Sequence, residues 1–178
     1  MEIYLIRHTT PEIEKGIIYG KRLEVGLANS FMAEAQKIKE QFSFSTDIIY
    51  CSPAARCTLL ADYLFPGNYH KDERLHEMDF GEWEGKTWND IPQDELNKWM
   101  NDYENIAPPN GESMNQMQER VMNFINELIQ SGKNKITIIT HAGVIRLMLS
   151  HFYKKPMSEL FAEKIDFGEV IKINPPGL

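Results

Sequence analysis

Two histidines each follow a short apolar run rich in β-branched residues. Arg7 and His8 end the run that opens the chain, and His141 follows a second run over residues 135–140. Both runs are typical of buried strands that end at a loop. Because parallel α/β sheets bind ligands at the carboxyl ends of their strands, we expect the two histidines to share one site. Taken alone, either histidine could equally end its strand and bond a nearby carbonyl.

The residues near these strand ends favour binding of a phosphate group. Arg7 and Arg56 carry planar guanidinium forks that match phosphate oxygens in paired hydrogen bonds. A helix predicted to start at Ala142–Gly143 adds free backbone N–H groups and a favourable dipole. The alternative for Arg56 is a surface salt bridge with Asp62 or Glu73.

A neutral histidine beside phosphate can act as a nucleophile. Its lone pair attacks phosphorus in line with the leaving oxygen, and water later hydrolyses the phosphohistidine. The other ring nitrogen must then donate to a carbonyl, which fixes the tautomer. Glu77 is the preferred proton donor to the leaving group because its neighbours Leu75 and Met78 favour partial burial, and Asp79 is the rival. Both carboxylates could instead cap a helix or bind a lysine.

The composition indicates one acidic domain of 178 residues, with 19 Lys plus Arg against 26 Asp plus Glu and a net charge of −7. No clustered basic face is visible, so general nucleic-acid binding is not expected. We expect no membrane span and no targeting segment, since no stretch approaches the roughly 20 apolar residues that a span requires. The two cysteines, Cys51 and Cys57, favour a reducing, cytoplasmic location. No spacing indicates a metal or cofactor site.

Strands that alternate with helices predict a three-layer α/β/α sandwich around a mostly parallel sheet. Ser52 is the expected N-cap of a helix that starts at Pro53, and Ser113 with Gln116 predicts a capping box. Short helices are expected in a helical insertion over about residues 82–112. The expected strands lie before His8, at 47–50, within 66–80, at 135–140 and at 169–173. The expected helices lie at 28–42, 53–65, 113–132, 144–153 and 157–163.

The chain resembles the histidine phosphatase superfamily, in its phosphoglycerate-mutase-like branch. Five motifs follow the family's order over nearly the whole chain: Arg7-His8, Ser52–Thr58, Leu75–Gly85, Pro109–Ser113 and Thr140–Gly143. The resemblance implies a phosphoglycerate-mutase-like fold and a phosphorylated nucleophile at His8. It also implies phosphoryl binding by Arg7, Arg56 and His141, proton donation by Glu77, and no metal.

The chain departs from the family pattern in the loop after His8. Thr9-Thr10-Pro11 stands where many members have glycine and then an acidic residue, and Glu14 stands where asparagine is common. We expect the backbone N–H of Gly20 to restore one phosphate contact, because glycine permits close approach to an anion.

Among subfamilies, the threonine-bearing signature, the Tyr19-Gly20 pair and the run Met78–Gly85 look most like the α-ribazole phosphatases of cobalamin synthesis. The expected substrate is therefore a small phosphomonoester, α-ribazole 5′-phosphate first. The alternatives are a broad-specificity sugar or small-molecule phosphatase and a mutase-like enzyme. Tyr19, Trp83 and Trp88 could stack on a base-like ring, although each tryptophan is expected to pack the insertion onto the sheet.

Two rival functions follow from the same residues. Cys51 precedes Arg56 as in cysteine phosphatases, but the four intervening residues are one fewer than those enzymes use, so the loop would misaim its amides. The second rival is a module that binds a phosphorylated ligand without turnover. The presence of all five candidate side chains disfavours it. The sequence leaves the oligomeric state open.

Overall fold

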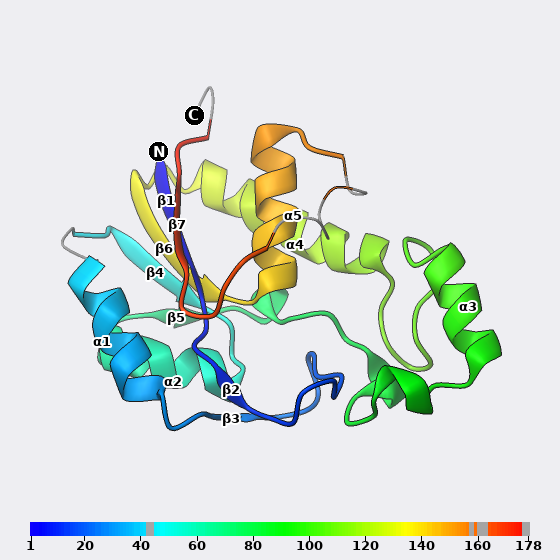
Figure 1. Cartoon of the computed structure of the whole chain (residues 1–178). Helices are drawn as coiled ribbons and strands as arrows, with labels where there is room; N and C mark the ends of the chain where they lie inside the picture. Colours follow the sequence, from blue (N-terminus) through cyan, green and yellow to red (C-terminus); the bar gives the residue numbers. More distant parts are fainter. Residues whose placement is uncertain (42–44, 157–158, 160–163, 176–178) are drawn as a thin grey trace.

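A computed structural model describes residues 1–41, 45–156, 159 and 164–175. Its main sheet has the strand order β5-β4-β6-β1-β7 (Figure 1). The strands are β1 (Glu2–Arg7), β4 (Ile48–Cys51), β5 (His70–Lys71), β6 (Lys135–Thr140) and β7 (Val170–Ile173). Only the β1–β7 pair of this sheet is antiparallel within the described residues. The predicted mostly parallel sheet is confirmed.

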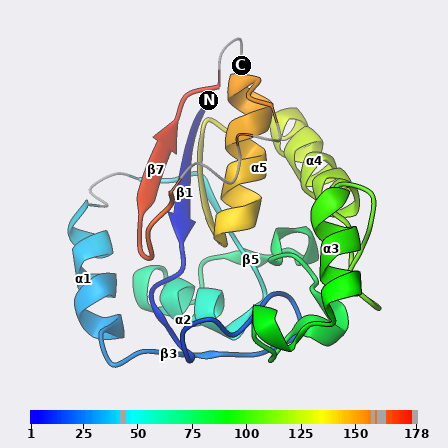
Figure 2. The same ribbon diagram turned by 45° about the vertical axis from the view of Figure 1, so that its right-hand side comes forward.

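Helices cover both faces of this sheet, as Figure 2 shows. Successive strand residues point to opposite faces, so Leu5 packs with α4 (Met114–Gln130) and α5 (Ala142–Tyr153). Ile6 packs on the other face with α1 (Phe31–Gln41) and α2 (Ala55–Leu64). The three-layer α/β/α sandwich is therefore confirmed. Every helix in the described ranges is too short or too polar to cross a bilayer.

The capping box predicted at Ser113 is present at the start of α4. The Ser113 hydroxyl accepts from the Gln116 N–H, and the Gln116 side chain accepts from the Ser113 N–H at 2.8 Å. The apolar stripe of α4, which includes Met117, Val121, Phe124, Ile125 and Leu128, is buried. This box fixes where α4 begins, directly after the Pro109–Ser113 motif.

Two predicted helix starts are wrong. Helix α1 begins at Phe31 rather than residue 28, and α2 begins at Ala55 rather than Pro53. The N-cap of α2 is Ala54, without a side-chain cap, and the Ser52 hydroxyl lies 2.8 Å from His141 Nε2 and accepts from the Ala54 N–H at 3.4 Å. The helix predicted at 157–163 lies outside the described residues except for residue 159, and so does residue 42, the last residue of the helix predicted at 28–42.

Irregular segments connect these elements near the carboxyl ends of the strands. The segment over residues 9–27, which follows His8, holds a two-stranded sheet of β2 (Pro11–Glu12) and β3 (Gly26–Leu27). Later segments hold the turns η1 (Glu73–Leu75), η2 (Gly81–Trp83) and η3 (Trp88–Asp90) and helix α3 (Gln93–Asn101). Helix α3 lies at the opposite end of the molecule from α1 (Figures 1 and 2).

Candidate active site

Strands β1 and β6 end at the same edge of the sheet. Their last paired residues are Arg7 and Thr140, so His8 and His141 follow side by side. The His8 N–H donates to the Thr140 carbonyl at 3.0 Å, and the two imidazole centroids lie 5.2 Å apart. The structure thus brings the two histidines together, as expected from the ends of their strands.

His8 is held as a neutral imidazole. Its side chain is buried, and its Nδ1 lies 2.8 Å from the Thr9 carbonyl. Burial, followed by the charge of Arg56, lowers the pKa of His8 from 6.5 to about 3. Because a carbonyl only accepts hydrogen bonds, Nδ1 carries the proton and Nε2 keeps its lone pair. This is the tautomer that a nucleophile requires.

Arg56 is fully buried in the first turn of α2, so the surface salt-bridge alternative is wrong. Its Nη2 donates to the Gly20 carbonyl at 2.7 Å, whereas its Nε and Nη1 have no partner. Arg7 donates to the Ile165 carbonyl at 2.6 Å and likewise leaves its Nε without a partner. No carboxylate pairs with either arginine within the described part of the chain. An anion would satisfy these buried donors.

His141 is also buried, and burial with the charge of Arg56 holds its pKa well below 6.5. Its Nε2 lies 2.8 Å from Ser52 Oγ, and its Nδ1 has no partner. This role of Ser52 was not predicted from the sequence, because a serine before proline is also a typical N-cap. The signal that could have found it is position, since Ser52 directly follows the end of β4 next to β6.

Glu77 lies half-buried at the start of α5. Its Oε2 accepts from the Gly143 N–H at 3.3 Å, and its Oε1 accepts from the Met78 N–H at 3.2 Å. A Cβ at residue 143 would lie 2.3 Å from Glu77 Oε1, so only glycine leaves room for this carboxyl group. The rival Asp79 accepts from Arg22 Nε at 2.7 Å and from the Gly81 N–H at 2.9 Å. Asp79 is therefore engaged within its own loop.

The structure corrects the contact predicted for Gly20. Its N–H donates to Glu84 at 3.0 Å and is not free for a phosphate, while its carbonyl holds Arg56. A Cβ at this position would lie 2.0 Å from the Met78 carbonyl, so glycine serves packing between loops. Glu14 is exposed in its loop. Ala142 is the buried first residue of α5, and its contact with phosphate stays a prediction.

One of the three rings considered for stacking lies at this site. The Tyr19 ring lies 5.4 Å from the Arg56 guanidinium. Trp83 is buried in a small cluster with Ile18 and Ile91, and Trp88 stacks on Trp99, so both tryptophans pack within the helical segment. The expectation that they pack the insertion onto the sheet is wrong, because the cluster around Trp83 contains no residue of the main sheet and Trp88 is partly exposed.

The comparison with known families agrees with this geometry. The sequence profile of the histidine phosphatase superfamily (branch 1) matches residues 3–177. The chain belongs to the histidine phosphatase superfamily. It is therefore a phosphatase, and its fold is that of the phosphoglycerate-mutase-like proteins.

Individual histidine phosphatases are similar over nearly their whole length. The adenosylcobalamin/α-ribazole phosphatase of Escherichia coli is 26% identical over 178 residues, which cover 94% of this chain and 87% of that protein. A protein of Hydrogenobacter thermophilus named for phosphoserine phosphatase activity is 29% identical over 183 residues, 98% of this chain and 90% of its own. The crystal structure of the α-ribazole phosphatase from Shigella flexneri has a TM-score of 0.89 at 26% identity, covering 98% and 90%.

The cysteines of this histidine phosphatase do not resemble nucleophiles. Cys51 and Cys57 are free and buried, and burial raises the pKa of both thiols, to about 12 for Cys57. A thiol with a raised pKa is a poor nucleophile, because the thiolate is the reactive form. The cysteine phosphatase reading is therefore wrong.

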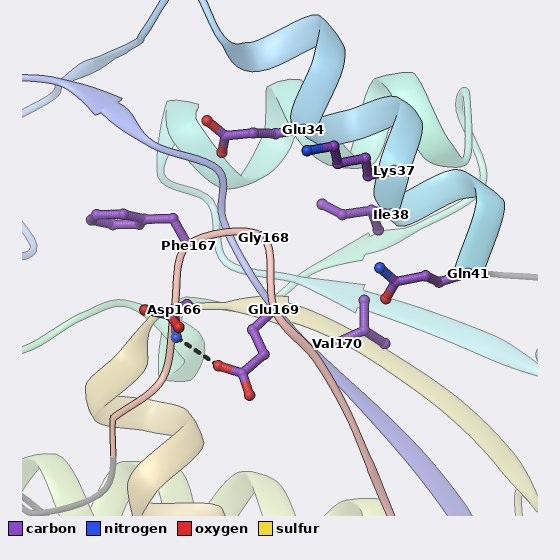
Figure 3. Close-up of a pocket in the computed structure, with 9 residues that line it drawn as sticks. All are labelled: Glu34, Lys37, Ile38, Gln41, Asp166, Phe167, Gly168, Glu169 and Val170. Carbon is purple, nitrogen blue, oxygen red and sulfur yellow. Dashed lines mark hydrogen bonds between the residues drawn. The ribbon is translucent and has the colours of Figure 1, made fainter.

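Phe167 is a neighbour of the site that was not predicted from the sequence. Its ring lies 3.7 Å from the Arg7 guanidinium carbon and 5.5 Å from the His8 ring. No local pattern marks it, since it belongs to a loop more than 150 residues away in the chain. Behind this loop, next to α1, lies a surface pocket of about 360 Å³ whose lining includes Glu34, Lys37, Asp166 and Glu169 (Figure 3). It contains none of the predicted site residues.

Proposed function

We propose that the protein is a metal-independent phosphomonoester hydrolase that forms a phosphohistidine at His8. The observation that carries the proposal is a neutral, buried His8 beside the buried Arg56 and the half-buried Arg7, both of which have buried N–H donors without a partner. Such a site attracts a dianion despite the negative charge of the whole chain, because the local field outweighs the net charge.

In the first step His8 Nε2 attacks phosphorus. The N–P bond forms as the bond from phosphorus to the ester oxygen breaks, and Glu77 transfers its proton to the departing oxygen. Arg7 and Arg56 take up the charge on the equatorial oxygens, together with Nδ1–H of His141 and the backbone N–H of Ala142. The buried donors of this group are in place before the charge develops.

In the second step water replaces the histidine. The Glu77 carboxylate takes a proton from water as the water oxygen attacks phosphorus, and the N–P bond breaks. His8 leaves as the neutral imidazole that its low pKa favours, and inorganic phosphate is released. The position of Glu77 against the start of α5, next to His141, supports its use in both steps.

The test of this mechanism is identification of the phosphorylated residue. Acid-labile phosphate should be trapped on His8 during turnover in the presence of EDTA, and mass spectrometry should locate it there. His8→Ala should abolish turnover, whereas Cys51→Ser, a matched change of a buried side chain at a neighbouring strand end, should retain it. Label on another residue, or loss of activity on chelation, would contradict the proposal. Phosphate binding without turnover in the wild type would instead favour the non-catalytic module.

We propose α-ribazole 5′-phosphate as the substrate. Similarity to the Escherichia coli and Shigella flexneri α-ribazole phosphatases supports this choice. The Tyr19 and Phe167 rings at the site could contact the aromatic base of the alcohol that leaves. Phosphoserine is the second candidate, because of the Hydrogenobacter relative. The two free cysteines are consistent with action in the cytoplasm.

A panel of phosphomonoesters tests the substrate. Values of kcat/KM for α-ribazole 5′-phosphate, phosphoserine, 3-phosphoglycerate and sugar phosphates should be compared without added metal. A preference of about 100-fold for α-ribazole 5′-phosphate, roughly 2.7 kcal/mol, would support the proposal. Equal values across the panel would favour a broad-specificity phosphatase, and mutase transfer would appear as phosphoglycerate isomerisation.

A further inference from the structure

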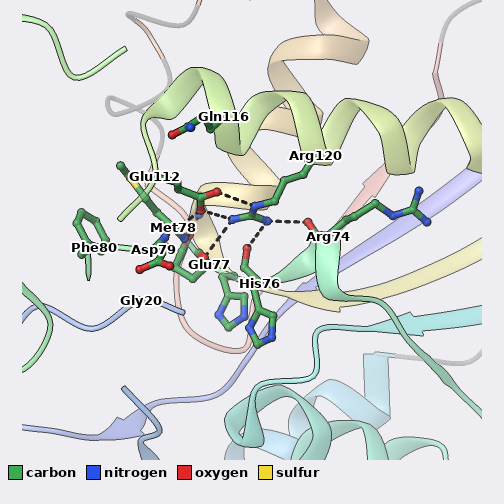
Figure 4. A network of polar contacts seen from close by, with 12 residues as sticks. Gly20, Arg74, His76, Glu77, Met78, Asp79, Phe80, Glu112, Gln116 and Arg120 are labelled. Carbon is green, nitrogen blue, oxygen red and sulfur yellow. Dashed lines mark hydrogen bonds and ion pairs between the residues drawn. The ribbon is translucent and has the colours of Figure 1, made fainter. Parts of the chain in front are cut away.

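The guanidinium group of Arg120, on α4, has all five of its N–H donors in use (Figure 4). Two of its bonds go to the carboxylate of Glu112, at 2.6 and 3.0 Å. The other three go to backbone carbonyls, those of residues 74 and 76 at 2.7 Å and that of Glu77 at 3.1 Å. The Arg120 side chain thus anchors the backbone of the loop that carries Glu77, the proposed proton donor.

The loop over residues 74–79 has no regular partner strand, yet each of its carbonyls is bonded. Arg120 satisfies three of them, and the Thr140 hydroxyl donates to the carbonyl of residue 75 at 2.7 Å. The N–H groups of Lys21 and Glu112 donate to the last two, at 3.1 and 2.9 Å. Irregular backbone next to a core is held in place only by such partners. Arg120 contributes more of them than any other residue of this set.

We propose that Arg120 is the positioning residue of the proton donor. Its fork fixes the loop so that the Glu77 carboxyl stays against the Gly143 N–H, within reach of the ester oxygen. The ion pair with Glu112 orients the fork, and the same Glu112 carboxylate accepts from the Asp79 N–H at 2.9 Å on the far side of Glu77. The proposal rests on the proposed function, because it presumes that Glu77 is the acid.

We expect arginine to be required at position 120 for the geometry of its five N–H donors rather than for its charge alone. Lysine keeps the charge but offers a single ammonium, which cannot span Glu112 and three carbonyls in one plane. The loop would then lose its common anchor and Glu77 would shift. A shift of about 1 Å in a catalytic group can cost about 100-fold in rate.

The experiment compares wild type, Arg120→Lys, Glu77→Gln and the double variant on two kinds of substrate. A primary alkyl phosphate has a poor leaving group that needs the proton, whereas p-nitrophenyl phosphate has a good one that does not. Arg120→Lys should lower kcat/KM, which reports formation of the phosphohistidine and not its hydrolysis, by roughly 10–100-fold for the alkyl phosphate and should spare kcat/KM for p-nitrophenyl phosphate. In the Glu77→Gln background the same change should have little further effect on either substrate.

The other outcomes separate the two proposals. If Glu77→Gln lowers kcat/KM equally for both substrates, Glu77 is not the acid, and both the acid assignment and the role of Arg120 fall. If Glu77→Gln discriminates but Arg120→Lys does not, or its effect adds fully to that of Glu77→Gln, only the positioning role is overturned.

Two further variants guard against a folding defect. Arg74→Lys is the matched control, because its side chain pairs with Asp72 and Glu127 and holds none of the loop carbonyls. Arg74→Lys should leave the ratio of kcat/KM for the two substrates unchanged. If Arg120→Lys fails to fold, Glu112→Gln weakens the same ion pair while retaining a side-chain acceptor. It should show the same dependence on the leaving group in milder form, and a uniform loss would overturn the proposal.

Discussion

Ser52 Oγ lies 2.8 Å from His141 Nε2, in a contact that is buried from solvent. The contact joins the ends of β4 and β6, so the sheet itself sets its geometry. For Nδ1–H of His141 to donate to a phosphoryl oxygen, Nε2 must accept a hydrogen bond, and the serine hydroxyl is the donor in position. Ser52 is therefore placed to stabilise the tautomer that would bind the substrate, and Cys57 Sγ lies farther from the same nitrogen, at 3.6 Å.

We predict that Ser52→Ala shifts the His141 tautomer and lowers kcat/KM by about tenfold, as loss of an orienting partner typically does. Nitrogen-15 NMR of the imidazole should show Nδ1–H for His141 in wild type and a mixture in the variant. The control is Thr58→Ala, which removes a hydroxyl that bonds only within the first turn of α2, to the Ala55 carbonyl. An unchanged tautomer in Ser52→Ala would refute the role.

Gly143→Ala should damage catalysis while sparing the fold. The added Cβ would lie 2.3 Å from Glu77 Oε1, and the carboxyl group can rotate away more easily than α5 can move. We expect a loss of kcat/KM of roughly 10–100-fold on alkyl phosphates, with a smaller loss of kcat/KM on p-nitrophenyl phosphate. Gly26→Ala is the matched control, since its Cβ would meet no atom closer than 3.6 Å. Equal kinetics in the two variants would show that Glu77 tolerates the methyl group.

Acid should destabilise the fold through the buried histidines. The pKa of His8 falls from 6.5 to about 3 on folding, and that of His141 falls as well, so the unfolded chain binds more protons in this interval. Their contribution to the free energy of unfolding is complete above about pH 6.5 and decreases on acidification, by at most ~1.4 kcal/mol per pH unit for each histidine.

Urea unfolding at about pH 7, 6 and 5 measures this slope, and His8→Asn should flatten it by the share of one histidine. The choice of range limits the contribution of ordinary carboxylates, which titrate lower. A slope that is the same in His8→Asn and wild type would mean that His8 is not buried as a neutral ring.

The sequence was sufficient to predict the edge of the sheet where the site lies. The runs before His8 and His141 are continuous apolar stretches, which are typical of buried strands. The capping box at Ser113 is a local pattern that specifies the start of a helix. Local patterns could not assign Ser52, because its hydroxyl fits an N-cap and a strand-end partner equally well.

Long-range contacts account for the remaining differences. The Gly20 N–H is occupied by Glu84, 64 positions along the chain, and the carbonyl bonds of Arg120 span 43 to 46 positions. No periodicity or spacing encodes such partners, since they depend on how loops from separate βα units meet. The same limit applies to Phe167, which reaches Arg7 from the segment before β7.

Arg56→Lys should weaken anion binding more than it weakens the fold. The buried Nε and Nη1 donors of Arg56 would be lost, and hydrogen bonds to charged groups contribute about 1.5–3 kcal/mol each, so phosphate affinity should fall by at least about tenfold. Inorganic phosphate or vanadate should raise the Tm of wild type, and the same concentration should raise the Tm of the variant less, because stabilisation depends on the ratio of ligand concentration to Kd. Arg74→Lys, which alters an arginine outside the site, should respond to phosphate like wild type. A full phosphate response in Arg56→Lys would place the anion elsewhere.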